Sequence, residues 1–238
     1  MNRTCNSEFI RSRRSAFTLI ELLVVISIIL IAASILFVGG RGGGGAKLST
    51  AQRIVSSIAQ GARGQAILKN AKTRLIIYSD NNTGSDSDPD KMLRYFGIIY
   101  ADPESADMSK PDWIAGTKGT YLPEGIYFDP DGGPDAAIGS NPWDDSNTMN
   151  LEYPRASAQA EGSGPEYYYY SFNRNGTMAN GFENNWLVFR SGTLKPDESG
   201  ALAVEFPEAG EEGENLKSAI IFRRVGTTTP VTDPADID

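Results

Sequence analysis

The sequence lacks histidine altogether and has a single cysteine, Cys5. The absence of histidine excludes Ser-His-Asp triads, zinc sites held by imidazole and acid–base catalysis by a histidine side chain. A lone cysteine cannot close a disulfide within the chain, and the preceding Arg3 and Thr4 are not the apolar residues expected before a lipid attachment site. These absences argue against the common classes of hydrolase and against a domain held together by disulfides.

Positive charge is also scarce. Lys and Arg number 22 against 30 Asp and Glu, which gives a formal net charge of −8 at pH 7. An acidic body disfavours nonspecific binding to nucleic acid and docking on an anionic membrane surface. The first 16 residues are the exception, with a net charge of +3 from Arg3, Arg11, Arg13 and Arg14 against Glu8.

One long apolar run follows these arginines. Residues 17–38 hold only four polar side chains, namely Thr18, Glu21, Ser27 and Ser34. A helix of this length spans about 33 Å, enough to cross the hydrocarbon core of a bilayer, and the arginines place its N-terminal end in the cytoplasm. A charge at mid-bilayer costs roughly 2.5–3.5 kcal/mol, so Glu21 is expected to have a partner.

Residues 16–25, Ala-Phe-Thr-Leu-Ile-Glu-Leu-Leu-Val-Val, resemble the N-terminal cleavage and methylation signal of type IV pilins and type II secretion pseudopilins. The resemblance implies that a prepilin peptidase cuts between Ala16 and Phe17 and methylates the new amino group of Phe17. Residues 1–16 are then a leader, and the processed chain carries a formal charge of −11. The family usually has Gly before the cut, for which Ala16 is the smallest replacement.

The resemblance also implies a role for Glu21 in assembly. In this family the corresponding carboxylate pairs with the free amino terminus of a neighbouring subunit. A buried carboxylate or ammonium is costly alone, and pairing offsets much of that cost. Only correctly staggered helices allow the pair, so it would set their register. The alternative is a carboxylate at the helix start that reaches to the membrane interface.

A glycine-rich hinge and a second helix are expected next. Residues 39–45 include six glycines, each of which weakens a helix by about 1 kcal/mol relative to Ala. The run is expected to melt the helix or form a hinge, and either a flexible joint or a tolerated linker fits it. Apolar residues then recur at three- and four-residue steps from Ala46 and predict an amphipathic helix that ends near Asn70 or Ala71.

Segments rich in β-branched and aromatic residues follow, separated by turn sequences such as residues 129–133 and 173–176. The expected strands are residues 73–78, 93–100, 125–128, 167–172, 186–190, 201–206 and 219–224. Consecutive strands without a long intervening helix indicate an antiparallel sheet. The predicted fold class is α+β, with a long N-terminal hydrophobic helix packed on an antiparallel β-sheet domain over residues 46–238.

A second resemblance concerns this domain. The later half of the helix, residues 73–78, residues 172–177 and residues 186–189 look like the H-type minor pseudopilins, in which a helix leads into a sandwich-like pair of sheets. Residues 101–164 depart from that pattern and are expected to be an insertion of loops. The turn Asn-Pro-Trp-Asp at residues 141–144 is instead similar to the Asp-Pro-Trp-Gly turn of the major, G-type pseudopilins.

Three acidic loops offer the hard oxygen ligands that suit calcium. The candidate ligands are Asp80, Asn82, Asp86, Asp88 and Asp90 in the first loop, Asp129, Asp131 and Asp135 in the second, and Asp144, Asp145 and Asn147 in the third. The first loop does not match an EF-hand, because Gly84 falls one place early and no glutamate closes it. G-type pseudopilins bind calcium in a loop, but solvated turns are the preferred interpretation, and no cofactor is expected.

Two further patterns could indicate binding, but each also has an ordinary structural explanation. In a strand, the four tyrosines at 167–170 should send two side chains into the core and two to the surface, where a pair could bind a partner or a sugar. Ordinary cross-strand packing is preferred. Arg223 and Arg224 lie near a C-terminal end at which some minor pilins carry a basic DNA-binding tail, but residues 227–238 contain three aspartates and no basic residue, so nucleic-acid binding is not expected.

Together these features predict a non-enzymatic structural subunit of a pilus-like filament, and within that class a minor pseudopilin of a type II secretion-like system. The implied partners are the prepilin peptidase, other pilin or pseudopilin subunits and the inner-membrane assembly platform. The expected location is the inner membrane, single-pass, with a periplasmic C-terminal domain that later joins a filament. A type IV pilus subunit for adhesion, motility or DNA uptake and a membrane-anchored periplasmic binding module are the alternatives.

Overall fold

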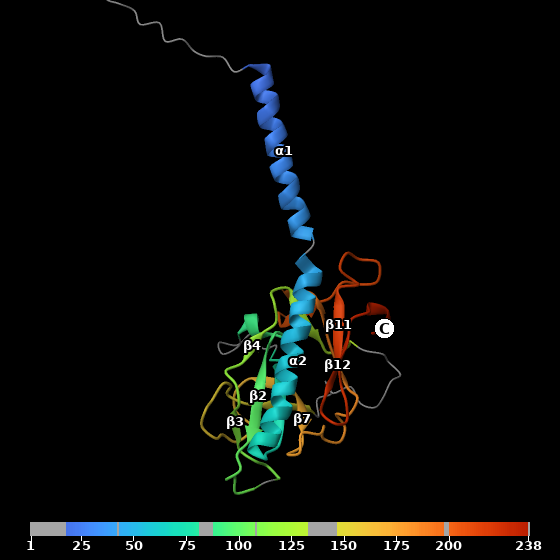
Figure 1. Cartoon of the computed structure of the whole chain (residues 1–238). Coiled ribbons are helices and arrows are strands. Elements are labelled where there is room, and N and C mark those ends of the chain that lie inside the picture. Colours follow the sequence, from blue (N-terminus) through green and yellow to red (C-terminus); the bar gives the residue numbers. More distant parts are fainter. Residues whose placement is uncertain are drawn as a thin grey trace, which may run out of the picture. The chain divides into compact units, whose positions relative to one another are not determined.

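The computed structural model describes residues 18–41, 43–80, 88–107, 109–132, 147–197 and 200–237, and within residues 31–43 it describes the backbone alone. The chain divides into two compact units, Met1–Gly43 and Gly44–Asp238 (Figure 1).

The first unit contains helix α1, Leu19–Arg41. Thr18 precedes its first residue, and the Leu22 N–H donates to the Thr18 carbonyl at 3.2 Å. Of the helices in the described part of the chain, none is both long and apolar enough to cross a membrane. A membrane span over residues 17–38 stays a prediction.

Helix α2, Gly43–Lys69, opens the second unit and begins three residues earlier than expected. Residues 39–41 and 43–45 of the glycine run lie in helical backbone, with α1 ending at Arg41 and α2 beginning at Gly43, so a hinge in this run stays a prediction. Packing accounts for one of these glycines, since a Cβ on Gly44 would lie 2.6 Å from Leu216 Cδ1 and glycine lets the domain approach closely. The helix ends at Lys69, and the left-handed φ of 47° at the following Asn70 terminates it near the expected place.

The remainder of the second unit is antiparallel β-structure. The larger sheet has the order β3-β2-β1-β7-β6, with β4 paired to β2. Its strands are β1 (Thr73–Tyr78), β2 (Tyr95–Ala101), β3 (Trp113–Ala115), β4 (Thr120–Tyr121), β6 (Thr148–Asn150) and β7 (Glu166–Phe172). The smaller sheet has the order β12-β11-β8-β5, and a separate hairpin pairs β9 with β10.

The strands of the smaller sheet are β5 (Ile126–Asp129), β8 (Trp186–Ser191), β11 (Lys217–Phe222) and β12 (Thr228–Val231), and those of the hairpin are β9 (Thr193–Pro196) and β10 (Leu202–Glu205). Two short 3₁₀ helices, η1 (Pro89–Lys91) and η3 (Pro234–Asp236), complete the described elements. All seven expected strands are present, with ends displaced by at most two residues. The expected insertion of loops at residues 101–164 is only partly right, because the short strands β3, β4 and β6 lie there besides the expected β5.

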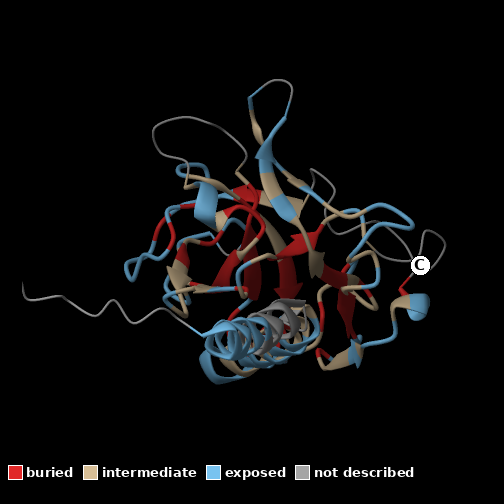
Figure 2. Cartoon of the chain, turned by 90° about the horizontal axis from the view of Figure 1, so that it is seen from above, coloured by how far each residue is buried: buried red, intermediate tan, exposed pale blue. Residues whose placement is uncertain are grey.

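The main core lies between α2 and both sheets. The buried face of α2 consists of small side chains at steps of three and four residues, namely Ala51, Val55, Ala59, Ala62 and Ala66. Ring contacts join the two sheets in this core, with Phe96 and Phe128 centroids 5.1 Å apart and Phe172 and Phe222 centroids 6.0 Å apart. The buried residues, red in Figure 2, gather in these strands. The α+β class with a helix on antiparallel sheets is confirmed.

The opposite face of the larger sheet is buried as well, because residues 151–161, here called the covering segment, lie over it. Leu151 and Tyr153 of this segment share a second core with Ile76, Tyr78 and Tyr167. The expectation that two of the four tyrosines lie on the surface is therefore wrong. Tyr167 and Tyr170 are buried, and Tyr168 and Tyr169 are half-buried against the cores on either face of the sheet.

Candidate functional site

Two polar side chains form a closed arrangement at the start of α1. The Glu21 N–H donates to Thr18 Oγ1 at 3.3 Å, and Glu21 Oε2 accepts from the Thr18 N–H at 3.5 Å and from the Thr18 hydroxyl at 3.4 Å. This reciprocal pattern is a capping box, which satisfies backbone donors that the first helical turn leaves unpaired. A carboxylate at this end also interacts favourably with the helix dipole.

The capping box leaves Glu21 able to act outside its own helix. Both contacts to Glu21 Oε2 are long, 3.4 and 3.5 Å, and the residue is exposed. An ionised carboxylate offers about four acceptor sites, so a second donor fits beside Thr18. The capping box matches the alternative in which the Glu21 carboxylate stays at the start of its own helix. Pairing of Glu21 with the amino terminus of a neighbouring subunit stays a prediction. Ala16 and Phe17, at the expected cleavage site, lie outside the described residues.

A buried arginine, Arg74, lies in the domain at a position that no sequence pattern indicated as a site. The Arg74 guanidinium in β1 lies 3.7 Å from the ring centroid of Tyr169 and 4.3 Å from that of Trp113. Its Nη1 contacts Glu161 Oε2 at 3.3 Å and Met149 Sδ at 3.3 Å. Burial lowers the pKa of Arg74, and Tyr169 and Glu161 oppose that shift. Since Glu161 belongs to the covering segment, Arg74 holds that segment on the sheet.

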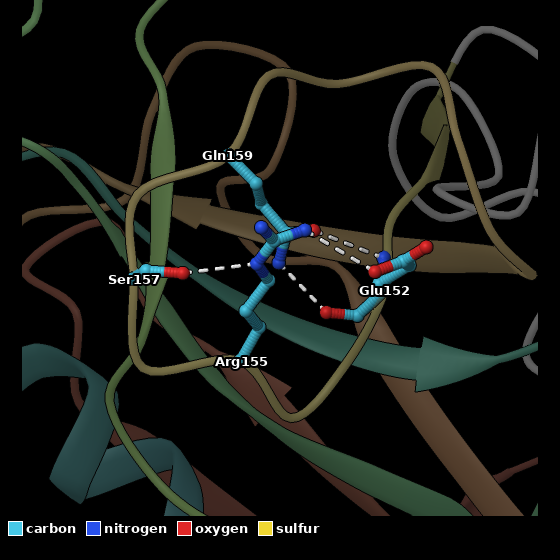
Figure 3. Close-up of polar contacts among 4 residues, drawn as sticks. All are labelled: Glu152, Arg155, Ser157 and Gln159. Atoms are coloured by element: carbon cyan, nitrogen blue, oxygen red, sulfur yellow. Dashed lines mark hydrogen bonds and ion pairs between the residues drawn. The ribbon is translucent and has the colours of Figure 1, made fainter.

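The covering segment is also closed by its own polar contacts (Figure 3). The Gln159 side-chain amide donates to the Glu152 carbonyl at 2.7 Å, and its Oε1 accepts from the Glu152 N–H at 3.3 Å. Arg155 donates to Ser157 Oγ at 2.9 Å and to Glu152 Oε2 at 3.2 Å. Gln159 and Trp113 exchange both main-chain hydrogen bonds, at 2.8 and 3.1 Å, which ties the segment to β3. These contacts describe a rigid cover for the sheet.

The first calcium candidate is engaged by protein groups where it is described. Asp88 Oδ1 accepts from the Asp90 N–H at 3.2 Å, and Asp88 Oδ2 lies 3.1 Å from Lys91 Nζ. Asn82 and Asp86 lie outside the described residues. Within the described ranges, no three acidic side chains converge on a point where they could hold a metal ion.

The second candidate is likewise engaged by protein groups where it is described, and the third lies largely outside the described residues. Asp129 Oδ2 lies 3.3 Å from Arg190 Nη1, and its Oδ1 accepts from the Asp131 N–H at 3.1 Å. Burial raises the pKa of Asp129, and Arg190 opposes this shift. Its carboxylate is thus one half of a buried ion pair. Asp135, Asp144 and Asp145 lie outside the described residues, whereas Asn147 lies inside them, next to β6.

A polar cavity lies beside the end of α2. Its volume is about 470 Å³, and its lining residues are Lys72, Ala101, Pro111, Asn173, Arg174 and Asn175. Burial and the nearby Arg74 charge lower the pKa of Lys72, and Glu161 opposes them. The expected basic pair lies nearby in the turn after β11. There, Arg223 Nε donates to Thr229 Oγ1 at 3.0 Å, and Arg224 Nε lies 3.9 Å from Glu183 Oε1.

Comparison with protein families bears on the first unit. Residues 11–37 match the family model described as the prokaryotic N-terminal methylation motif. The matched stretch includes the expected cut, both residues of the capping box and most of α1. This match supports the likeness of the N-terminal segment to the signal of type IV pilins and pseudopilins. No curated protein and no solved structure matches the chain.

Proposed function

We propose that the protein is a non-enzymatic structural subunit of a pilus-like filament, and within that class an H-type minor pseudopilin of a type II secretion-like system. The observation that carries this proposal is the methylation motif at residues 11–37, with Glu21 in the first turn of an apolar helix. The domain adds support, because a helix laid against two antiparallel sheets fits the H-type pattern.

The proposed route begins with the leader in the cytoplasm and the apolar helix in the inner membrane. A prepilin peptidase removes residues 1–16 and methylates Phe17, and the assembly platform then lifts the subunit into a filament. Helices in such a bundle exchange lipid contacts for protein contacts, so apolar burial changes little on assembly. Pairing of Glu21 with the Phe17 amino group of a neighbour would then select the register.

The processing step has a direct test. Intact mass and N-terminal sequencing are measured on protein recovered from membranes with and without an active prepilin peptidase. We expect a peptidase-dependent chain that starts at methylated Phe17. A chain that keeps Arg11 to Ala16, or one cut after Val38, would contradict the proposal and favour an anchored binding module.

The assembly step is tested with two variants that separate capping from pairing. Glu21→Ala removes both the cap and the carboxylate, whereas Thr18→Ala removes the capping partner and leaves the carboxylate in place. We expect both variants to be cleaved, and only Glu21→Ala to be missing from sheared filaments. Equal loss of both variants would mean that Glu21 acts through helix capping alone. A surface-exposed filament would favour the type IV pilus alternative, and a short periplasmic filament the pseudopilin.

A further inference from the structure

Strands β7 and β11 end in matching turns. The sequences are Phe-Asn-Arg-Asn-Gly-Thr at 172–177 and Phe-Arg-Arg-Val-Gly-Thr at 222–227. In the first turn, Asn173 N donates to Thr177 O at 2.8 Å and Gly176 N to Asn173 O at 2.8 Å. In the second, Arg223 N donates to Thr227 O at 2.8 Å and Gly226 N to Arg223 O at 2.7 Å. Both glycines have a φ of 79°, and each turn presents an arginine at its tip.

The two turns pack on each other and on the last part of α2. The Met178 N–H donates to the Arg224 carbonyl at 3.0 Å, and a Cβ on Gly226 would lie 1.8 Å from Gly176 O. A Cβ on Gly176 would lie 2.8 Å from Ile67 Cδ1 and 3.1 Å from Arg63 Cγ. Glycine at both positions therefore permits this close stack, and the turns and the helix end form one surface.

This surface is basic, although the chain is acidic. Its cationic residues, here called the basic tip, are Arg63, Lys69, Lys72, Arg174, Arg223 and Arg224. Exposed apolar side chains lie among them, with Ile67 50%, Leu68 82% and Val225 56% exposed. The acidic groups recorded against the tip are Glu183 beside Arg224 and Glu161 near Lys72. Apolar groups within a charged rim are typical of a protein docking surface.

The opposite end of the same domain carries the complementary charge. Residues 205–214, here called the acidic loop, contain five glutamates and neither Lys nor Arg. Glu205 is paired with Lys195, and Arg190 donates to Pro207 O, so the charge available to a partner comes from Glu208, Glu211, Glu212 and Glu214. Main-chain N–H groups of Glu208 and Gly210 bind the carboxylates of Glu211 and Glu214 at 3.0 and 2.7 Å, which gives the loop a defined shape. In Figure 1 this orange-red loop lies where α2 begins, and Leu216 just beyond it packs on Gly44.

We propose that the basic tip of one copy docks on the acidic loop of a second copy, so that the domains join head to tail. This inference rests on the filament-subunit part of the proposed function and is separate from the minor assignment. A minor subunit is present in few copies, so an extended chain of copies would favour a major subunit. Opposite charges attract the basic tip of one copy to the acidic loop of another, and like charges repel one tip from another tip. Such a contact joins two different surfaces, so it does not close on itself and extends into a chain of copies.

Cysteine cross-linking of the full chain tests this contact, because Cys5 is the sole cysteine and Cys5→Ser gives a clean background. Arg174→Cys and Glu212→Cys are introduced singly and together, and a short bismaleimide is added to native membranes and to purified protein in detergent. Within one copy, the turn that holds Arg174 packs on Arg63 of α2, and the loop that holds Glu212 lies near Gly44 at the start of α2. The rise of α2 between Gly44 and Arg63 is about 30 Å, so a short bismaleimide cannot link the two cysteines of one copy. We expect a ladder of dimers, trimers and longer products from the double variant, and none from either single variant.

Charge reversal adds a second readout. Reversing Arg174 and Arg224 to Glu, in the variant that carries cysteines at Asn175 and Glu212, should lower the cross-linked fraction about tenfold, equivalent to about 1.4 kcal/mol. Reversal of Glu208 and Glu211 to Lys in the same chain should restore the fraction. Arg53→Glu, an exposed arginine of α2 outside the tip, is the matched control and should leave the ladder intact.

The outcomes are separable from those of the proposed function. Processed protein that pellets as filaments but gives no ladder overturns the docking contact and leaves the filament subunit standing. A dimer from a single-cysteine variant would also overturn it, because it indicates that like surfaces meet. Protein that is neither processed nor pelleted counts against the filament subunit, and the detergent sample then decides the contact alone. Retention of a nucleic-acid probe that depends on the tip, without a ladder, would assign the tip to that ligand instead.

Discussion

The guanidinium of Arg74 lies 3.7 Å from the ring centroid of Tyr169, and both side chains are covered by residues 151–161. Trp113 lies on the same guanidinium at 4.3 Å, and Glu161 supplies the opposite charge at 3.3 Å. The charge is thus compensated by two aromatic faces and one carboxylate in place of water. Desolvated cation–π contacts of this kind are worth about 2 kcal/mol or more.

Removal of Arg74 should therefore loosen the covering segment. Arg74→Ala is expected to lower the free energy of unfolding by about 2–4 kcal/mol, because both ring contacts and the ion pair disappear. Arg155→Ala is the matched control, since its ion pair with Glu152 is exposed and should contribute less than about 1 kcal/mol. Denaturant unfolding of the full chain in detergent, followed by tryptophan fluorescence, measures both variants. Equal effects would show that the stack contributes nothing beyond a surface ion pair.

A glycine in β2 makes a second contact beneath the covering segment. A Cβ on Gly97 would lie 1.9 Å from Tyr153 Oη, whose hydroxyl bonds Thr117 O at 2.8 Å. Gly97→Ala should therefore displace Tyr153 and cost about 1–3 kcal/mol of stability. Gly64→Ala, in α2 with nothing within 4 Å of the new methyl, should instead stabilise by about 0.5–1 kcal/mol. Thermal unfolding of the two variants should shift in opposite directions, and a stabilised Gly97→Ala protein would contradict the packing.

The strands that the sequence predicts and those it misses differ in length and burial. Residues 73–78 are β-branched or aromatic at most positions and form β1 over the expected range. The missed strands β3, β4, β6, β9 and β12 have only two to four residues, too few for an alternation to register. The four tyrosines show the reverse error. Alternation between core and surface was expected, but the covering segment buries one face of the sheet, and α2 with the smaller sheet buries the other.

The candidate sites also differ in whether the local sequence predicts them. Thr18 and Glu21 are three residues apart, so the helix start with Glu21 in its first turn follows from the local sequence. Arg74 could not be found from the sequence, because Trp113, Glu161 and Tyr169 join it only when three distant segments fold together. The basic tip likewise depends on two turns, at 173–177 and 223–227, that become neighbours only in the folded domain.

Tyr95 should make the domain sensitive to alkaline pH. Burial, with Tyr153 and Tyr121 nearby, raises the pKa of Tyr95 from 10.0 to about 12. Between these values the unfolded chain loses a proton that the folded chain keeps, so stability falls as pH rises through this window and is intact below pH 10. Tyr95→Phe loses the hydrogen bond to Lys118 O but should show a shallower alkaline decline. Denaturant midpoints at pH 9 to pH 12 measure the slope, and parallel curves would rule out Tyr95 as the cause.

The glycine run can be tested for its two roles, a joint or a tolerated linker, with one pair of neighbours. A methyl on Gly45 meets nothing within 4 Å, whereas a methyl on Gly44 lies 2.6 Å from Leu216 Cδ1. Gly45→Ala is therefore expected to stabilise α2 by about 0.5–1 kcal/mol, and Gly44→Ala to lose most of that gain because Leu216 must move. Unfolding curves measure the difference, and equal stabilisation would show that Leu216 does not pack on this turn. If a flexible joint is needed for assembly, Gly45→Ala should lower filament yield while raising stability; an unchanged yield identifies the run as a tolerated linker.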